Sequence, residues 1–246
     1  MFTIENREME ILHAAVNWDL ENLSSLSKNS KTLILGSFNP NNFNPKENTD
    51  FYYGRSTNHF WKSIARNLKL PENYFVNNRE RKIDCMEKHK FFFFDLINSI
   101  KLTCNDEDVL IQYLNEYIFT NYSDKELFRV RPYKFNNQYI NKTLEFNYSI
   151  LEFLEQNNTT RIVHSLGNNR IDNNLTARPL DVNMGFNPFV SQIINISYKN
   201  GIEFISTSFS PSQTSVNRGG INYRSNLDYW INQNILTPYP NKKRHN

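Results

Sequence analysis

The clearest pattern along the chain is a series of short apolar runs that alternate with amphipathic segments. Thr32 to Leu35, Phe91 to Phe94 and Arg161 to Leu166 are short and apolar, as buried strands are. Val190 to Ile196 and Glu203 to Ser206 have the same character, the second being very short. The pattern therefore predicts five strands in this order.

The segments between these runs carry apolar residues at helical spacing. The predicted helices are Glu8 to Leu26, a helix after Thr57, Arg79 to Lys90, Val109 to Tyr117, Thr143 to Leu154 and Asn222 to Asn232. Alternating strands and helices predict an α/β fold, a three-layer sandwich with a central, mainly parallel sheet flanked by helices. We expect a single domain over residues 1–237 and a disordered tail over 238–246.

Composition narrows the class of protein. A chain of 246 residues with 39% hydrophobic residues can bury one full core. The two cysteines are too few for a disulfide framework or a four-thiolate metal site. The net charge of +3 permits a polyanionic partner without arguing for one. The N-terminus does not resemble a signal peptide, and no apolar run approaches the length of a membrane span. We expect a monomeric, cytoplasmic protein that needs no metal or cofactor.

Two polar loops follow predicted strands and hold the candidate chemistry. The first, Gly36 to Pro40, reads Gly-Ser-Phe-Asn-Pro, and the second is the Ser-rich segment Ser208 to Ser215. If their strands are adjacent in a parallel sheet, both loops meet at one crevice, where α/β proteins bind ligands. Beyond the first loop lie the aromatic pair Tyr52 and Tyr53 and then an Asn-His-Phe-Trp sequence that starts at Asn58.

These motifs together resemble the uracil-DNA glycosylase superfamily. The strand-ending Gly36 with Asn39-Pro40, the later Asn-His-Phe-Trp and the late Pro-Ser-x-x-Ser are similar to its mismatch-specific uracil and thymine branch. The double tyrosine and the Gly-Ser-Phe opening resemble its hypoxanthine branch. Phe94-Asp95-Leu96 and Leu166-Gly167 fall where the superfamily has further core strands. The resemblance implies a DNA glycosylase fold and activity.

The resemblance also implies roles for individual residues. Asn39 would position the attacking water, and Asn58 is the alternative catalytic residue, since the first loop is one residue longer than in the mismatch-specific branch. Tyr53 would stack on the extruded base, with Gly36, Ser37 and Phe38 beside it. The DNA-binding loop that fills the hole left by the base would comprise Ser210, Pro211, Ser212, Gln213, Thr214 and Ser215.

The chemistry of base removal explains these residue types without reference to a family. A base inside a duplex must be flipped into a pocket before it can be attacked. Cleavage of the N-glycosidic bond needs a held water on one side and hydrogen-bond donors for the leaving base on the other. Asn amides offer both an acceptor and donors. A carboxylate would be a stronger base, and Asp50 and Asp95 are the candidates.

We therefore predict a monofunctional glycosylase that acts on double- or single-stranded DNA. It would hydrolyse the bond to uracil, hypoxanthine or a modified pyrimidine and leave an abasic site, in repair or in defence against modified foreign DNA. The alternative is a protein of the same fold that binds a modified base without cutting. A nucleotidyltransferase shares the Gly-Ser-Phe-x-Pro opening, but it requires a His-x-Gly-His sequence that does not follow here.

Overall fold

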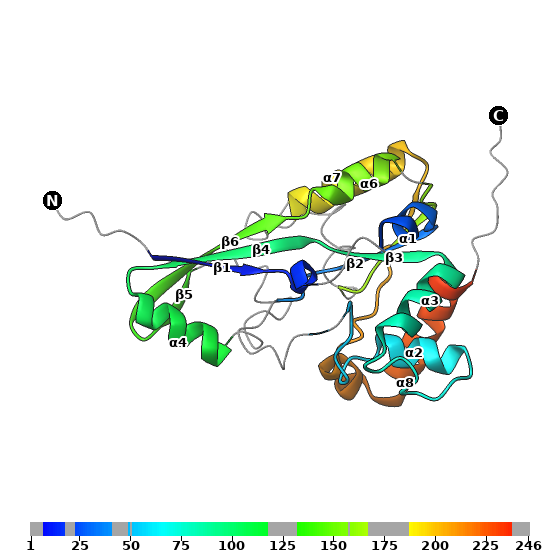
Figure 1. Cartoon of the computed structure of the whole chain (residues 1–246), viewed down its shortest axis with the longest axis horizontal. Coiled ribbons are helices and arrows are strands. Elements are labelled where there is room, and N and C mark those ends of the chain that lie inside the picture. Colours follow the sequence, from blue (N-terminus) through cyan, green and yellow to red (C-terminus); the bar gives the residue numbers. More distant parts are fainter. Residues whose placement is uncertain are drawn as a thin grey trace.

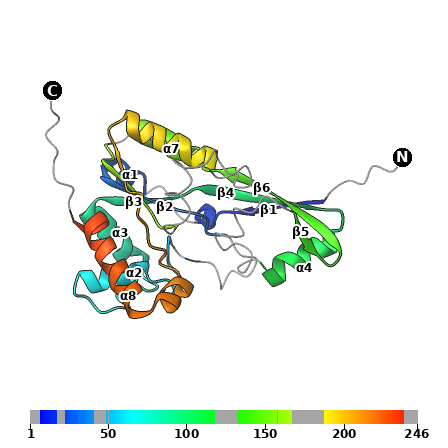
Figure 2. The ribbon, with the colours of Figure 1, turned by 180° about the vertical axis from the view of Figure 1, so that it is seen from behind.

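The computed structural model describes residues 7–17, 23–40, 49, 51–117, 132–156, 158–166 and 187–237, which form a mixed α/β structure with two four-stranded sheets (Figures 1 and 2). One sheet is entirely parallel and has the order β3-β2-β7-β8. Its strands are β2 (Thr32–Gly36), β3 (Phe91–Asp95), β7 (Arg161–His164) and β8 (Glu203–Phe204). All four correspond to apolar runs that the sequence predicted as strands, and β2 and β3 each extend one residue further.

The other sheet is antiparallel and was not predicted. It has the order β1-β4-β6-β5. Its strands are β1 (Arg7–Leu12), β4 (Ile97–Cys104), β5 (Tyr133–Phe135) and β6 (Gln138–Phe146). Because β3 ends at Asp95 and β4 begins at Ile97, the chain passes from one sheet into the other almost without a break. The prediction of one mainly parallel sheet is therefore correct for half of the strands only.

Helices connect and cover these strands. They are η1 (Ala14–Asn17), α1 (Leu23–Asn29), α2 (Phe60–Asn67), α3 (Arg79–His89), α4 (Glu107–Tyr117), α6 (Ser149–Gln156), α7 (Asn187–Lys199), α8 (Gln213–Ile231) and the π-helical turn η3 (Asn232–Leu236). No helix in the described part of the chain is both long and apolar enough to cross a membrane. The predicted tail 238–246 lies outside the described residues, and the single domain stays a prediction.

The two central strands of the parallel sheet, β2 and β7, are buried on both faces because each carries apolar residues on both. Leu33 and Leu35 of β2 belong to a core cluster that includes residues of α6 and α7. Ile34, whose side chain points to the opposite face, belongs to a second cluster with residues of α2 and α8. Figure 1 shows the same arrangement, with α6 and α7 above the sheet and α2, α3 and α8 below it.

Three predicted elements are wrong. Glu8 to Leu26 is not one helix: Met9 and Ile11 turn inward at a spacing of two, and the segment begins with strand β1. Thr143 to Leu154 is likewise divided between β6 and α6. Val190 to Ile196 is not a strand but part of α7, in which Phe189, Val190 and Ile193 are buried at helical spacing. The β-branched residues favoured a strand in this segment. It is helical because burial of one helical face outweighs that preference.

Candidate functional site

A cavity of about 190 Å³ opens at the carboxyl ends of the parallel strands. It lies where the strand order reverses, since β2 leads to β3 on one side and β7 leads to β8 on the other. The lining residues are Ser37, Phe38, Asn39, Pro40, Thr49, Tyr52, Tyr53, Gly54, Arg55, Asn58, Asp95, Ser165, Ser210, Pro211 and Ser212. Both predicted loops meet here, although β7 separates β2 from β8.

Gly36 and Asp95 end neighbouring strands beside this cavity. They are paired in register between β2 and β3. A Cβ atom on residue 36 would collide with Oδ1 of Asp95 and with the hydroxyl of Tyr53. Gly36 is therefore required for space, and the room that its missing side chain leaves is filled by the Asp95 carboxylate, which is itself 8% exposed.

His13 holds the Asp95 carboxylate from the antiparallel side of the molecule. Its Nε2 lies 2.6 Å from Oδ2 of Asp95, and both side chains are buried. The backbone N–H of Ala15 donates to Nδ1 of His13 at 3.0 Å, so the ring proton resides on Nε2 and is donated to the carboxylate. His13 was missed by the sequence analysis because it lies in the segment that was predicted as one helix. The chain between β1 and η1 carries no local motif that would have revealed it.

Backbone contacts fix this histidine next to the first loop. The N–H of Ala14 donates to the carbonyl oxygen of Asn39 at 2.7 Å, and His13 forms an isolated bridge with Pro40. The His13 ring also contacts Phe38 edge to face, with 5.7 Å between the ring centroids. The imidazole and the Gly36–Pro40 loop therefore form one packed unit.

The two tyrosines play different structural parts. Tyr52 is buried and stacks on Phe93, and burial, followed by the negative charge of Asp95, raises the pKa of its hydroxyl, which stays protonated. Tyr53 has a left-handed backbone (φ 53°), and its hydroxyl lies 2.6 Å from Oγ of Ser165. One face of the Tyr53 ring stacks on Phe60. Stacking on an inserted base would therefore use the opposite face.

The two candidate asparagines present opposite ends of their amides. Nδ2 of Asn39 donates one of its two hydrogens to Oγ1 of Thr49 at 2.6 Å, and no hydrogen bond to its amide oxygen occurs within the described residues. Oδ1 of Asn58 accepts the backbone N–H of Phe60 at 2.8 Å, where only an oxygen can serve, so its NH₂ group remains as a donor. Both residues line the cavity. Asn39 therefore offers its amide oxygen as an acceptor, and Asn58 offers its NH₂ group as a donor.

Three residues in the middle of the second loop contact the cavity. Ser210, Pro211 and Ser212 line it, and the carbonyl oxygen of Pro211 accepts the N–H of His59 at 2.8 Å. Oγ of Ser212 accepts the N–H of Ser215 and caps α8. The predicted DNA-binding residues Gln213, Thr214 and Ser215 are not among the lining residues but form the first turn of α8, where Gln213 and Thr214 are exposed.

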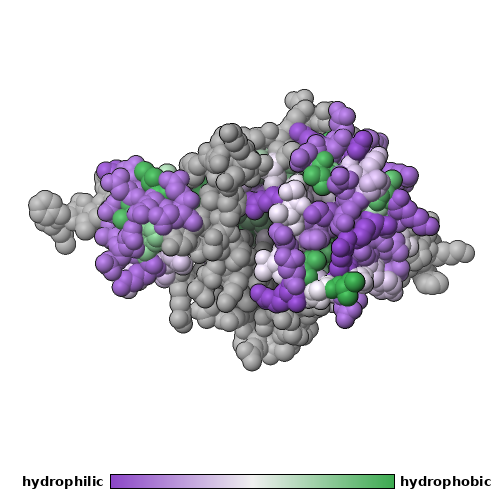
Figure 3. Space-filling model, turned by 90° about the horizontal axis from the view of Figure 1, so that it is seen from below, coloured by the Kyte–Doolittle hydropathy of each residue, from purple (hydrophilic) through white to green (hydrophobic). Residues whose placement is uncertain are grey.

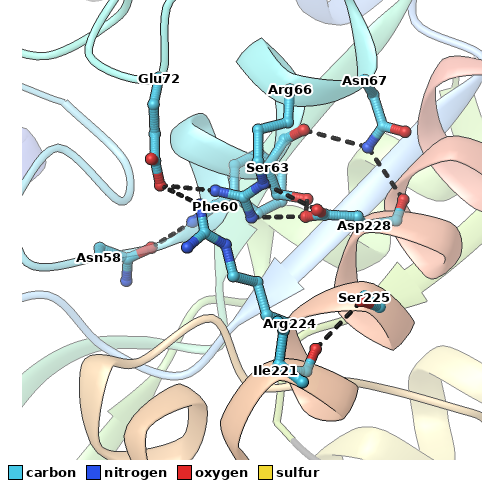
Figure 4. A network of polar contacts seen from close by, with 10 residues as sticks. All are labelled: Asn58, Phe60, Ser63, Arg66, Asn67, Glu72, Ile221, Arg224, Ser225 and Asp228. Atoms are coloured by element: carbon cyan, nitrogen blue, oxygen red, sulfur yellow. Dashed lines mark hydrogen bonds and ion pairs between the residues drawn. The ribbon is translucent and has the colours of Figure 1, made fainter.

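A network of ion pairs and hydrogen bonds joins α8, the helix that follows this loop, to α2 (Figure 4). The guanidinium of Arg66 donates to both carboxylate oxygens of Asp228, at 2.7 and 2.6 Å. Ser63 donates to the same carboxylate. Glu72 accepts from Arg66 and from Arg224. We call the residues Ser63, Arg66, Glu72, Arg224 and Asp228 the α2–α8 clamp.

The structure thus brings Asn39, Asn58, Tyr53, Ser37 and Phe38 to one cavity. It adds Asp95, which the sequence analysis named as a candidate, and His13, which it did not. Asp50 lies outside the described residues. Comparison with protein-family models, with curated proteins and with solved structures gives no match.

Proposed function

We propose that the chain is a DNA glycosylase that flips a damaged or modified base into the cavity and hydrolyses its N-glycosidic bond. The observation that carries this proposal is the joint presence of an amide oxygen on Asn39, an amide donor on Asn58 and the ring of Tyr53 around one small cavity. The helices on both faces of the parallel sheet support a sandwich of the uracil-DNA glycosylase type as the corresponding fold.

The size of the cavity favours a single heterocycle as its occupant. About 190 Å³ is too small for a base pair, so only an extruded nucleotide would place a base inside. Tyr53 would stack on that base, and Ser37, Ser165 and Asp95 would face its polar edge. We therefore place the reaction at the bond between base and sugar. The phosphates of the DNA backbone would stay outside the cavity.

The two amides divide the catalytic work. The oxygen of Asn39 would accept a hydrogen bond from a water and hold it against the anomeric carbon. The NH₂ group of Asn58 would donate to the base, on which negative charge develops as the bond breaks. The two asparagines therefore act together rather than as alternatives in this proposal.

The surroundings of the cavity suit a nucleic acid. The exposed Arg55 lines the cavity. Figure 3 shows that the face of the molecule with α2 and α8 is mostly hydrophilic, with separate small hydrophobic patches. Arginine is a typical phosphate contact that positions a protein on DNA. The DNA would approach over this face.

A strand-break assay tests the proposal. Labelled duplexes and single strands carrying uracil, hypoxanthine or modified pyrimidines are incubated with the protein and then heated in alkali, which breaks the chain at abasic sites. We expect breaks at a subset of these bases with wild type and with the exposed-asparagine control Asn105→Ala. Binding of a modified base without any break would favour the non-catalytic alternative, and neither binding nor breaks would refute the proposal.

A further inference from the structure

We infer that Ile221 is an apolar wedge that enters the base stack of duplex DNA when the target base is extruded. This inference rests on the proposed glycosylase function and deepens it, because it assigns a DNA contact outside the loop that the sequence predicted for this task. In that loop Gln213 and Thr214 are exposed but polar, so they gain little from leaving water for the space between stacked bases.

A sharp turn at two glycines divides helix α8 immediately before Ile221. Gly220 has a φ of 62°, which residues with a side chain rarely adopt. A Cβ atom on residue 219 would lie 2.4 Å from Cβ of Tyr223, so Gly219 is required for the close approach of its backbone. The second part of the helix then begins, and the carbonyl oxygen of Ile221 accepts from Oγ of Ser225 (Figure 4). The chain has seven glycines in all, and two of them give this turn a fixed shape.

The Tyr223 side chain ties this turn to the edge of the cavity. Its hydroxyl accepts the backbone N–H of Ser210 at 2.9 Å and donates to the carbonyl oxygen of Ser210 at 3.1 Å. Ser210 lines the cavity, and the Tyr223 ring packs edge to face against Phe209, with 5.4 Å between the ring centroids. Because Gly219 packs against the other end of the same side chain, the turn, and Ile221 with it, is anchored beside a loop that lines the cavity.

Ile221 is left in water although α8 has an apolar face that packs on the core. It is 80% exposed, whereas Val216 and Leu227 of the same helix are buried. It therefore adds little to the stability of the free protein and gains by burial against a partner. A side chain that is branched at Cβ has few rotamers, so it loses little conformational entropy on insertion. Proteins that kink DNA insert apolar side chains of this kind between base steps.

The charges along this segment favour DNA as the partner. Residues 204–227 contain no aspartate or glutamate, and Arg218, three positions before Ile221, is exposed. Arg224, the other arginine of the segment, pairs with Glu72 inside the clamp. Arg55, which lines the cavity, is exposed as well. Contacts of Arg218 and Arg55 with phosphates would hold this face on the duplex and present Ile221 to the stacked bases.

Cleavage of the same base in a duplex and in a single strand tests this inference. A base in a single strand has no pairing partner to leave, so a wedge accelerates the duplex reaction only. In single-turnover kinetics, Ile221→Ala should lower the duplex rate roughly tenfold to a hundredfold and leave the single-strand rate near that of wild type. Ile221→Leu, which keeps the apolar bulk, should retain most of the duplex rate. The control Tyr229→Ala changes another residue of α8, which is 69% exposed, and it should alter neither rate.

A second readout of the wedge needs no cleavage. The probe is 2-aminopurine, a base that fluoresces more strongly when it is unstacked, placed beside each candidate target base in a duplex. We expect the fluorescence to rise when wild type binds, and to rise much less with saturating Ile221→Ala. Thermal unfolding and size-exclusion chromatography check that the fold and the oligomeric state of each variant are unchanged.

The outcomes separate the wedge from the proposed function. Equal losses on duplex and single strand, no loss on either, or no fluorescence rise with wild type would overturn the wedge while the glycosylase function stands. A variant that changes the oligomeric state but not the duplex rate would assign Ile221 to a contact between copies of the chain instead. Absence of cleavage with both substrates would refute the glycosylase function. A fluorescence rise that depends on Ile221 would then still support the wedge, in a protein that binds without cutting.

Discussion

The cavity and the α2–α8 clamp are both rich in polar side chains, but the hydrogen bonds of these side chains are completed to different extents. In the clamp, Asp228 receives hydrogen bonds from Arg66 and Ser63, and Glu72 receives them from two arginines. At the cavity, one oxygen of Asp95 is held by His13 and the other is left for a partner. Asn39 and Asn58 likewise use one end of each amide internally.

This contrast separates a stabilising network from a binding site. A fully satisfied group contributes to folding and has nothing left to offer a ligand. A half-satisfied group is oriented by its internal bond and presents its other end to whatever enters. Changes in the clamp should therefore alter stability and not base release, and changes at the cavity should do the reverse.

The largest expected effect belongs to the Asn39 side chain. Asn39→Ala removes the oxygen that would hold the water, and we expect the cleavage rate to fall roughly a hundredfold to a thousandfold, as for other single catalytic hydrogen-bonding groups. Its backbone carbonyl, which accepts from Ala14, is unaffected, so the loss of stability should be limited to that of the hydrogen bond between Nδ2 and Thr49, about 1 kcal/mol. Single-turnover kinetics with a cleaved duplex gives the rate, and an unchanged rate would remove Asn39 from the mechanism.

A clamp variant should show the opposite profile. Asp228→Ala leaves the Arg66 guanidinium without its bidentate partner, and we expect about 2 kcal/mol lower free energy of unfolding, the scale of hydrogen bonds to charged groups. Urea unfolding measures this loss. The rate of base release by the folded variant should not change, and a changed rate would show that the clamp and the cavity are coupled.

Asn58 lies at the boundary between the two regions, and two substitutions separate its roles. Asn58→Ala removes the acceptor for the N–H of Phe60 at the start of α2 and should cost about 1 kcal/mol of stability. Asn58→Asp keeps that acceptor and removes the donor, so it should retain stability and still lose cleavage. Full activity of Asn58→Asp would limit this residue to capping the helix.

The smallest expected effect is a pH dependence of the free energy of unfolding that arises from His59, whose pKa responds to the charges of the clamp. Burial, followed by the charges of Lys62, Arg66 and Arg224, lowers the pKa of His59. The unfolded chain then binds more protons than the folded protein, so stability should decline as the pH falls below about 6.5. Urea unfolding at several pH values should show a shallower decline for His59→Gln. Equal slopes for the variant and wild type would assign the decline to other groups.

The sequence predicted the parallel strands because each is a short run with apolar residues on both faces. It also predicted that Asn39, Tyr53, Asn58 and Asp95 matter, since they follow strands or lie in motifs. It could not predict His13, which reaches Asp95 only through pairing of β1 with β4 across about ninety residues of chain. Nor could it assign the asparagine roles, because those depend on Thr49 and on the backbone of Phe60.

In the proposed function, the protein hydrolyses the bond between a base held in the cavity and its sugar. The most direct measurement is chromatographic detection of the free base, together with counting of abasic sites in the same duplex. We expect equal amounts of released base and abasic sites with wild type, and loss of both with Asn39→Ala. Intact base retained on the DNA, or strand breaks without any free base, would contradict the proposed function.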